Sequence, residues 1–271
     1  MNIKIIAVDM DGTFLRHDNT YDIDRFMEQY QQMKERGIRF VVASGNQYYQ
    51  LRSFFPTIQQ ELTFIAENGA FIVDQGKELF VAKLEEEDVQ KVIHAINKYP
   101  SIKKIVCGKK SAYINESVDD EYFNRLNFYY PELKRVSNFD SFDDTIFKVF
   151  LSCEEDNFDT ILQELKESIG HIMTPVDCGH FGIDLIIPGI NKAHGIQYLL
   201  DTWNSPTGET MAFGDSGNDY EMLEHATYSF AMDNAKDSIK EVSDYTIASN
   251  DQDGVLDAID WMLNKEKMFS E

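Results

Sequence analysis

The sequence has 271 residues, 43% of them hydrophobic, and 47 acidic side chains against 25 lysines and arginines give a formal net charge of −22. A surface so negative repels nucleic acids and anionic lipids, so neither is expected as a partner. The length is sufficient for a sizeable core in one large domain or two smaller ones.

The chain carries no recognisable signal for export or membrane insertion. No stretch approaches the roughly 20 apolar residues that a membrane span needs, and residues 3–6, Ile-Lys-Ile-Ile, are not part of a basic segment, apolar stretch and cleavage site of the secretory kind. Cys107, Cys153 and Cys178 share no close spacing, which is typical of free thiols in a reducing compartment. We therefore expect a cytoplasmic protein, and we expect it to be a monomer or a weak homo-oligomer.

Strand and helix patterns alternate along the first part of the chain. Short, nearly continuous apolar runs predict strands at residues 3–10, 38–43 and 62–66. Helical spacing predicts helices at 24–36, ended by Gly37, and at 46–55, stopped by Pro56. Residues 71–73 and 79–81 are typical of a hairpin with its turn at 75–76. This alternation with short links indicates a parallel sheet covered by helices.

After residue 83 the chain becomes richer in charged and aromatic side chains, which indicates an inserted α+β domain. Its expected elements are helices at 86–98 and 157–168 and strands at 102–106 and 145–151. Buried-strand character returns at 183–187, and we expect the parallel architecture to resume there. The elements expected after it are helices at 191–200, 218–225 and 255–263 and strands at 211–213 and 228–231. The predicted domains are therefore a core of residues 1–83 and 187–271 and an insert of residues 84–186.

Two acids follow the first predicted strand, in the motif Asp9-Met10-Asp11-Gly12-Thr13. Ligands bind beyond the carboxyl ends of strands in open α/β sheets, and the pair lies there. The alternative is a turn or helix cap, in which Asp and Gly are common. A calcium-binding EF-hand loop is excluded, because with Asp9 as the first position the sixth and twelfth are Phe14 and Thr20, where such a loop needs Gly and Glu. The pair is thus either a turn or a catalytic site.

Three further motifs follow predicted strands and open predicted helices. Ser44 and Gly45 precede a helix whose first N–H groups could cradle a phosphate, although ordinary capping would place the same residues there. Lys192 lies in the first turn of a predicted helix, where the macrodipole disfavours cations. A bound dianion would explain a lysine at this position. Asp215, in Gly-Asp-Ser-Gly-Asn-Asp, lies at a strand tip as Asp9 does, whereas Asp219 is an acid that a helix start favours in any case.

Together the four motifs are typical of phosphoryl chemistry. The three acids Asp9, Asp11 and Asp215 can hold Mg²⁺, which prefers oxygen ligands. The residues that can hold phosphoryl oxygens are Ser44, Gly45, Lys192 and Asn218. Asp9 would attack phosphorus to form an aspartyl-phosphate, and Asp11 would protonate the leaving alkoxide and later deprotonate water. An acid at this place favours an ordinary phosphate ester over ATP, whose leaving group needs little help.

The motifs D-M-D-G-T, A-S-G-N, N-K-A-H-G and G-D-S-G-N-D resemble those of the haloacid dehalogenase (HAD) superfamily, in particular the Cof-type phosphatases with a large cap inserted after the third strand. The resemblance implies a Rossmann-like parallel-sheet core with a cap of the C2 type. It also implies Asp9 as nucleophile and Asp11 as acid and base, with Mg²⁺ bound by the Asp9 carboxylate, the Asp11 backbone carbonyl and Asp215. The phosphate ligands implied by the family are the Met10 backbone N–H, Ser44, Gly45, Lys192 and Asn218, with Asp219 as support behind them.

The segment V-V-A-S-G-N-Q-Y-Y-Q-L resembles the sugar phosphatases within that family. Asn46 stands where many Cof-type members have Arg, and the sugar-phosphatase subgroup shares the Asn. We therefore expect a Mg²⁺-dependent phosphatase that hydrolyses phosphate monoesters of sugars. One alternative is a phosphosugar mutase or phosphotransferase with the same nucleophile. The other is a module that binds a phosphorylated metabolite without turnover, although such a module would not need Asp11.

Overall fold

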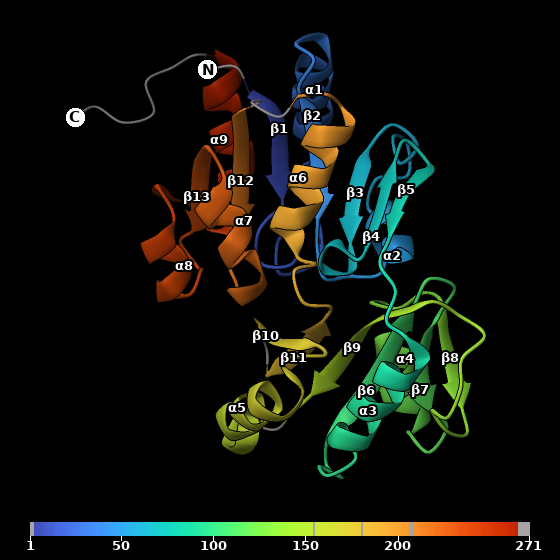
Figure 1. The fold of residues 1–271 in the computed structure, drawn as a ribbon. Helices are drawn as coiled ribbons and strands as arrows, with labels where there is room; N and C mark the ends of the chain where they lie inside the picture. Colours follow the sequence, from blue (N-terminus) through green and yellow to red (C-terminus); the bar gives the residue numbers. More distant parts are fainter. Residues whose placement is uncertain (1–2, 154, 180, 206–208, 265–271) are drawn as a thin grey trace. The chain divides into compact units, whose positions relative to one another are not determined.

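The computed structural model describes residues 3–153, 155–179, 181–205 and 209–264 (Figure 1). Its residue contacts divide the chain into two compact units, residues 1–44 with 196–271 and residues 45–195. Among the described residues, no helix combines the length and the apolar character needed to cross a membrane. The predicted domain boundaries at 83/84 and 186/187 stay a prediction, and each unit is described by itself.

The first unit contains a parallel sheet with the strand order β14-β13-β12-β1-β2. The strands are β1 (Ile3–Val8), β2 (Arg39–Ala43), β12 (Glu209–Gly214), β13 (Tyr228–Met232) and β14 (Tyr245–Ile247). Ile6 pairs with Met211 on one side and Phe40 on the other, and all three are buried. Burial on both faces explains why β1 and β2 are almost continuously apolar, and the predicted parallel core is confirmed.

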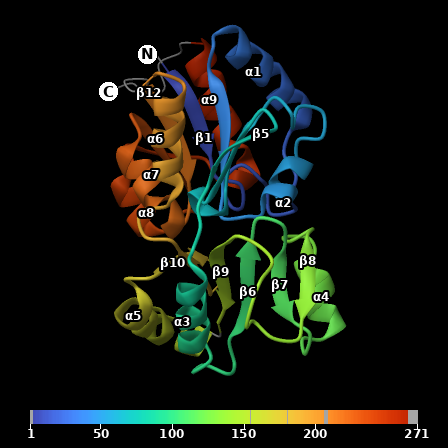
Figure 2. The ribbon, with the colours of Figure 1, turned by 45° about the vertical axis from the view of Figure 1, so that its right-hand side comes forward.

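Helices cover both faces of this sheet (Figures 1 and 2). The helices α1 (Ile23–Glu35) and α9 (Gly254–Asn264) pack together on one face, and α7 (Tyr220–His225) and α8 (Asp237–Val242) lie on the other. The chain steps from β1 to β2 in one direction and from β12 to β14 in the opposite direction. Because parallel crossovers are right-handed, the two directions place their helices on opposite faces.

The second unit begins with the short helix α2 (Tyr48–Ser53) and the antiparallel strands β3 (Thr63–Ala66), β4 (Phe71–Asp74) and β5 (Lys77–Val81). The predicted hairpin turn is confirmed, since Gln75 and Gly76 have φ of 50° and 75°. A turn with two left-handed residues matches the twist of the strands that it joins.

A second sheet in this unit has the strand order β10-β11-β9-β6-β7-β8. Its strands are β6 (Lys103–Gly108), β7 (Ala112–Asn115), β8 (Leu133–Val136), β9 (Ile146–Ser152), β10 (Thr174–Gly179) and β11 (Gly182–Ile186). The pairs are antiparallel except for β7 with β8. An apolar core joins this sheet to α3 (Glu86–Ile96) and α5 (Phe158–Ile169), while α4 (Asp120–Leu126) precedes β8. The predicted α+β insert is confirmed in its element types.

The expected return to the parallel architecture at residues 183–187 is wrong. Those residues form β11, which pairs antiparallel with β9 and β10. Ile183 and Leu185 are fully buried, but a strand buried in an antiparallel sheet has the same apolar pattern as one in a parallel sheet. The motif with Lys192 therefore follows a strand of the second sheet, whereas the motifs with Asp9 and Asp215 follow parallel strands.

Candidate active site

Asp9 lies at the carboxyl end of β1 and is only 5% exposed. Its N–H donates to the carbonyl of Phe213 in β12 over 3.1 Å, which extends the parallel pairing by one residue. The chain then turns back on itself, because the Phe14 N–H donates to the Asp9 carbonyl (3.2 Å) and the Leu15 N–H donates to the Met10 carbonyl (2.9 Å). This tight turn fixes the backbone that carries the two predicted catalytic acids.

Asp215 follows β12, in a loop that is built around the side chain of Asp219. The Asp219 Oδ2 accepts hydrogen bonds from the N–H groups of Asp215 (3.0 Å) and Ser216 (3.1 Å). Gly214 leaves the space for this carboxylate, since a Cβ there would lie 2.5 Å from the Asp219 Cβ. The Ser216 hydroxyl donates to the Asn218 side-chain carbonyl over 2.7 Å, and so it is engaged within the loop.

The carboxylates of Asp9, Asp215 and Asp219 converge, with one oxygen of each within 4.8 Å of the others. They meet because β1 and β12 are adjacent parallel strands whose carboxyl ends lie at the same sheet edge. Three buried or half-buried anions so close repel one another strongly unless a cation lies between them. An all-oxygen set of this kind suits a hard divalent cation such as Mg²⁺, so the residues present fit the predicted metal.

The position of Asp219 in this group differs from the expected set, which paired Asp9 and Asp215 with Asp11. Within the described residues, the group that could hold a metal does not include the Asp11 carboxylate. The prediction assigned the Asp11 backbone carbonyl as the ligand, and its side chain was reserved for proton transfer. Asp219 accepts two backbone N–H groups of the loop that carries Asp215, and its supporting role at the metal stays a prediction.

Gly12 and Thr13 set the orientation of Asp215. Gly12 has φ of +76°, and a Cβ there would lie 2.6 Å from the Asp215 Oδ2. The Thr13 hydroxyl donates to the Asp215 Oδ1 over 3.3 Å. The turn after β1 and the loop after β12 thus contact each other directly. Thr13, which makes one of these contacts, had no predicted role.

Two asparagines that the sequence analysis missed hold the turn after β1. The Asn234 side chain donates to the Gly12 carbonyl (2.8 Å) and accepts from the Asn250 N–H (3.1 Å), while the Asn250 side chain donates to the Leu15 carbonyl (2.8 Å). Asn234 follows β13 and Asn250 follows β14, so both lie at the sheet edge that carries Asp9. Their position directly after strands of the parallel sheet could have indicated them, but only the acids at such positions were predicted as site residues.

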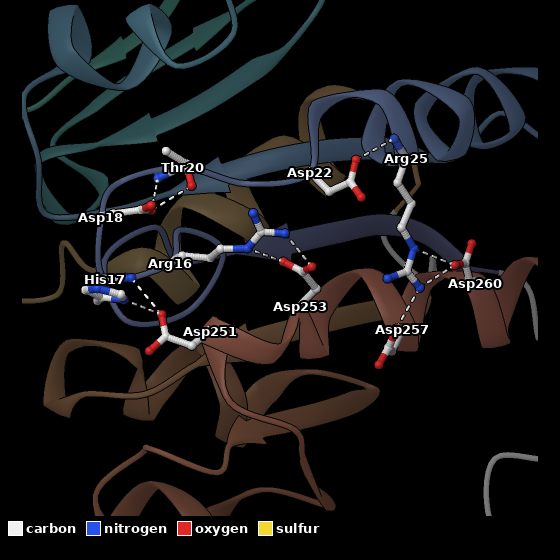
Figure 3. A network of polar contacts seen from close by, with 10 residues as sticks. All are labelled: Arg16, His17, Asp18, Thr20, Asp22, Arg25, Asp251, Asp253, Asp257 and Asp260. Atoms are coloured by element: carbon white, nitrogen blue, oxygen red, sulfur yellow. Dashed lines mark hydrogen bonds and ion pairs between the residues drawn. The ribbon is translucent and has the colours of Figure 1, made fainter.

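Ion pairs join the segment after this turn to the start of α9 (Figure 3). The Arg16 guanidinium donates to both carboxylate oxygens of Asp253, over 2.9 and 2.5 Å. The Asp253 hydrogen bond is the main reason why the pKa of Arg16 lies above its ordinary value. His17 contacts Asp251 through both its backbone N–H and its ring Nδ1, each at 2.9 Å, and this partner raises the pKa of the imidazole.

The same network continues into α1 (Figure 3). Asp22 caps α1 by accepting from the Arg25 N–H over 3.0 Å. The Arg25 guanidinium then reaches Asp257 (2.6 Å) and Asp260 (2.5 Å) on α9. Half-exposed pairs of this kind contribute modestly one by one, but together they bind α1 to α9, and the segment after the turn of β1 to the residues that immediately precede α9.

The predicted phosphate ligands divide between the two units. Ser44 and Asn218 lie in the first unit and are 2% and 9% exposed. Gly45 and Lys192 belong to the second unit, and Lys192 is fully buried at the start of α6 (Lys192–Thr202). Their placement at a phosphate, together with that of Met10, stays a prediction.

Comparisons with known proteins give this site a family. Residues 6–259 match the model of the haloacid dehalogenase-like hydrolases. The chain is 46% identical over 271 residues, which is all of both chains, to the 5-amino-6-(5-phospho-D-ribitylamino)uracil phosphatase YbjI of Escherichia coli (strain K12). It is 25% identical over 267 residues, 93% of this chain and 94% of the other, to the phosphatase of the same name YitU of Bacillus subtilis (strain 168).

Solved structures agree with the fold. The structure of SMU.1108c from Streptococcus mutans UA159 matches with a TM-score of 0.92 and 38% identity, covering 97% of this chain and 99% of that chain. The HAD subclass IIB sugar phosphatase BT4131 matches with a TM-score of 0.81 over 96% of this chain and 98% of that one, and its 21% identity supports the fold alone. With its acids at the strand ends and its inserted α+β domain, the chain belongs to the haloacid dehalogenase-like hydrolases, as a Cof-type member and a phosphatase.

Proposed function

We propose that this phosphatase is Mg²⁺-dependent and hydrolyses phosphate monoesters of sugars or sugar alcohols through an aspartyl-phosphate intermediate. The observation that carries the proposal is the convergence of the Asp9, Asp215 and Asp219 carboxylates within 4.8 Å at the carboxyl end of the parallel sheet. The Asp9 and Asp215 carboxylates and the Asp11 backbone carbonyl would hold the metal. When bound, Mg²⁺ would offset the negative charge of the carboxylates and of the phosphoryl oxygens.

Asp9 is the proposed nucleophile. Its carboxylate oxygen attacks phosphorus, a new O–P bond forms, and the bond between phosphorus and the ester oxygen breaks. Asp11, protonated at this stage, gives its proton to the leaving alkoxide. Asp11 then takes a proton from water, whose oxygen attacks phosphorus, so that inorganic phosphate leaves and the Asp9 carboxylate returns. The hydrogen-bonded turn 9–15 holds both acids for these steps.

The phosphoryl oxygens would be bound by the Met10 N–H, Ser44, Gly45, Lys192 and Asn218. Lys192 is buried at the start of α6. A helix start disfavours a lysine and favours an anion. A phosphate dianion bound there would offset the unfavourable position of the lysine, which supports the assignment.

The substrate class rests on two independent observations. The Asn46 motif resembles that of sugar phosphatases, and a relative of full length carries the name of a phosphatase for a phosphorylated ribitylamino compound. Both point to a phosphate ester of a polyhydroxylated compound. We further propose a cytoplasmic location and a monomer or weak homo-oligomer.

The test is phosphate release, with and without Mg²⁺, from a panel of hexose and pentose phosphates and 5-amino-6-(5-phospho-D-ribitylamino)uracil. We expect Asp9→Asn to lower turnover at least about 10³-fold while the fold is kept, and Asp24→Asn, at an exposed position of α1, to have no effect. Substantial activity of Asp9→Asn would refute the covalent route. Transfer of the phosphoryl group without release would instead indicate a mutase, and binding without turnover a sensor.

Asp11→Asn separates the acid role from binding. We expect it to impair sugar phosphates far more than p-nitrophenyl phosphate, because p-nitrophenolate leaves without a proton. Equal losses on both substrates would count against Asp11 as the acid. Omission of Mg²⁺ should abolish both activities.

A further inference from the structure

A buried cluster of charges, formed by residues outside the four sequence motifs, lies in the second unit. Lys148 in β9 is 2% exposed, and its Nζ lies 2.9 Å from the Glu67 Oε2 and 3.3 Å from the Asp184 Oδ1. Glu67 and Asp184 have side chains that are 1% and 3% exposed. Burial of ion pairs is rarely favourable compared with apolar packing, so such a cluster calls for a reason beyond stability.

The strand pattern makes the cluster more conspicuous. Val149 and Leu185, the neighbours of Lys148 and Asp184 along β9 and β11, belong to the apolar core with α3 and α5. Because side chains alternate across a sheet, Lys148 and Asp184 lie on the opposite face. That face is also buried at this place, yet it carries charges instead of apolar groups.

Lys148 binds the backbone of the predicted phosphate-binding turn. Its Nζ donates to the carbonyl of Gly45, which lies 103 residues earlier in the chain. The next carbonyl, that of Asn46, accepts from the Glu67 N–H over 3.2 Å. Gly45 also packs closely on Asp184, since a Cβ there would lie 3.0 Å from the Asp184 Oδ2. Two consecutive carbonyls of the turn are therefore held by members of the cluster.

The carboxylates keep Lys148 able to donate. Burial by itself lowers the pKa of the lysine, but the attraction of Asp184 and Glu67 outweighs it, so the pKa lies well above the ordinary value. Asp184 is itself held by the Asn68 side-chain amide over 2.6 Å. The two anions thus compensate the buried ammonium, and the ammonium is directed at the Gly45 carbonyl.

We propose that Lys148 is a positioning residue, which sets the Ser44-Gly45-Asn46 turn for phosphate binding by holding the Gly45 carbonyl. The inference rests on the proposed function, in which Ser44 and Gly45 bind the phosphoryl oxygens. Lys148 itself does not need to touch the substrate. The proposal gives the buried carboxylates a role, because they make a buried lysine tolerable at the back of the turn.

The test removes the anchor without changing the net charge of the cluster. The double variant Lys148→Met/Glu67→Gln loses one cation and one anion, and Glu67→Gln alone is the matched control because it keeps the lysine and the backbone N–H of residue 67. Lys110→Met, in the exposed turn between β6 and β7, controls for loss of a lysine. For each we measure KM and kcat with p-nitrophenyl phosphate, calorimetric binding of inorganic phosphate with Mg²⁺, and amide exchange of residues 43–51.

We expect the double variant to raise KM and the phosphate Kd by the same factor, about tenfold, with kcat within threefold of wild type, because a loosened turn weakens binding of substrate and transition state alike. Amide exchange should become faster in residues 43–51 and stay unchanged in β1. A purely structural role would instead lower kcat through a smaller folded fraction and leave KM unchanged, and that result would overturn the proposal.

The two proposals fail in different ways. If the wild type neither hydrolyses p-nitrophenyl phosphate nor binds phosphate, the proposed function fails, and amide exchange alone decides whether Lys148 holds the turn. If the double variant does not fold, Lys148→Met/Asp184→Asn replaces it, with Asp184→Asn as its control. Failure of both to fold would overturn a positioning role that is separable from folding.

Discussion

Gly12→Ala tests how closely the turn after β1 packs against the Asp215 loop after β12. Gly12 has φ of +76°, a conformation that costs an L-residue about 1–2 kcal/mol. The new Cβ would lie 2.6 Å from the Asp215 Oδ2, so this oxygen must withdraw by about 0.8 Å to reach an ordinary contact of 3.4 Å. Mg²⁺ requires near-ideal geometry at roughly 2.0–2.1 Å, and such a displacement is more than a third of a coordination bond.

Gly37→Ala is the matched control. Gly37 follows the C-cap of α1 with φ of +68°, but no atom outside its chain neighbours lies within 4 Å of the position that its Cβ would take. Both variants should lose about 1 kcal/mol of unfolding free energy in chemical denaturation without metal, because both place alanine in a left-handed conformation, and Gly12→Ala should lose more, because the Asp215 carboxylate must also move. Only Gly12→Ala should also lose Mg²⁺ affinity, by about 10- to 100-fold, the range seen when groups that orient metal ligands are changed.

The assays are Mg²⁺ titration of turnover and, independent of activity, calorimetric Mg²⁺ binding. Wild-type Mg²⁺ affinity in Gly12→Ala would refute the reasoning that this glycine makes room for the Asp215 carboxylate. An equal loss in Gly37→Ala would show that backbone strain, and not the contact with Asp215, is responsible.

Three further predictions concern the residues that support the turn after β1. Asn250→Ala should cost about 1–3 kcal/mol in chemical denaturation, because it leaves a buried carbonyl of the turn without its 2.8 Å donor, and a loss below about 0.5 kcal/mol would contradict that. A double-mutant cycle with Arg16→Met and Asp253→Asn should give a coupling of about 0.5–1 kcal/mol, since both side chains are partly exposed; additive effects would show that the pair contributes nothing. Pairing with Asp251 raises the pKa of His17 in the folded protein. His17→Gln should therefore be less stable than the wild type by the full contribution of this pair below about pH 6.5, the pKa of an unfolded histidine, and the difference should vanish as the pH rises through the folded-state pKa. A difference that grows with pH in denaturation curves between pH 5 and 8 would contradict this assignment.

The division between sequence and tertiary structure can be followed at single elements. The local sequence suffices to single out the two acids of the first motif, because a carboxylate directly after a buried strand is costly and needs a partner. The hairpin turn could also be predicted from adjacent residues, because it consists of Gln75 and Gly76 alone, both of which have positive φ. In contrast, β11 was assigned to the wrong architecture, because burial on both faces does not tell which sheet a strand joins.

The sequence by itself determined the parallel core, the inserted α+β domain and the acids at the strand tips, since each depends on patterns within about ten residues. Only the tertiary structure decided which distant groups support the site. Asn234 and Asn250 bind the turn after β1, and Lys148 binds a carbonyl 103 residues away. Each of these contacts joins segments through strand order and register, and no local pattern of side chains encodes such a pairing.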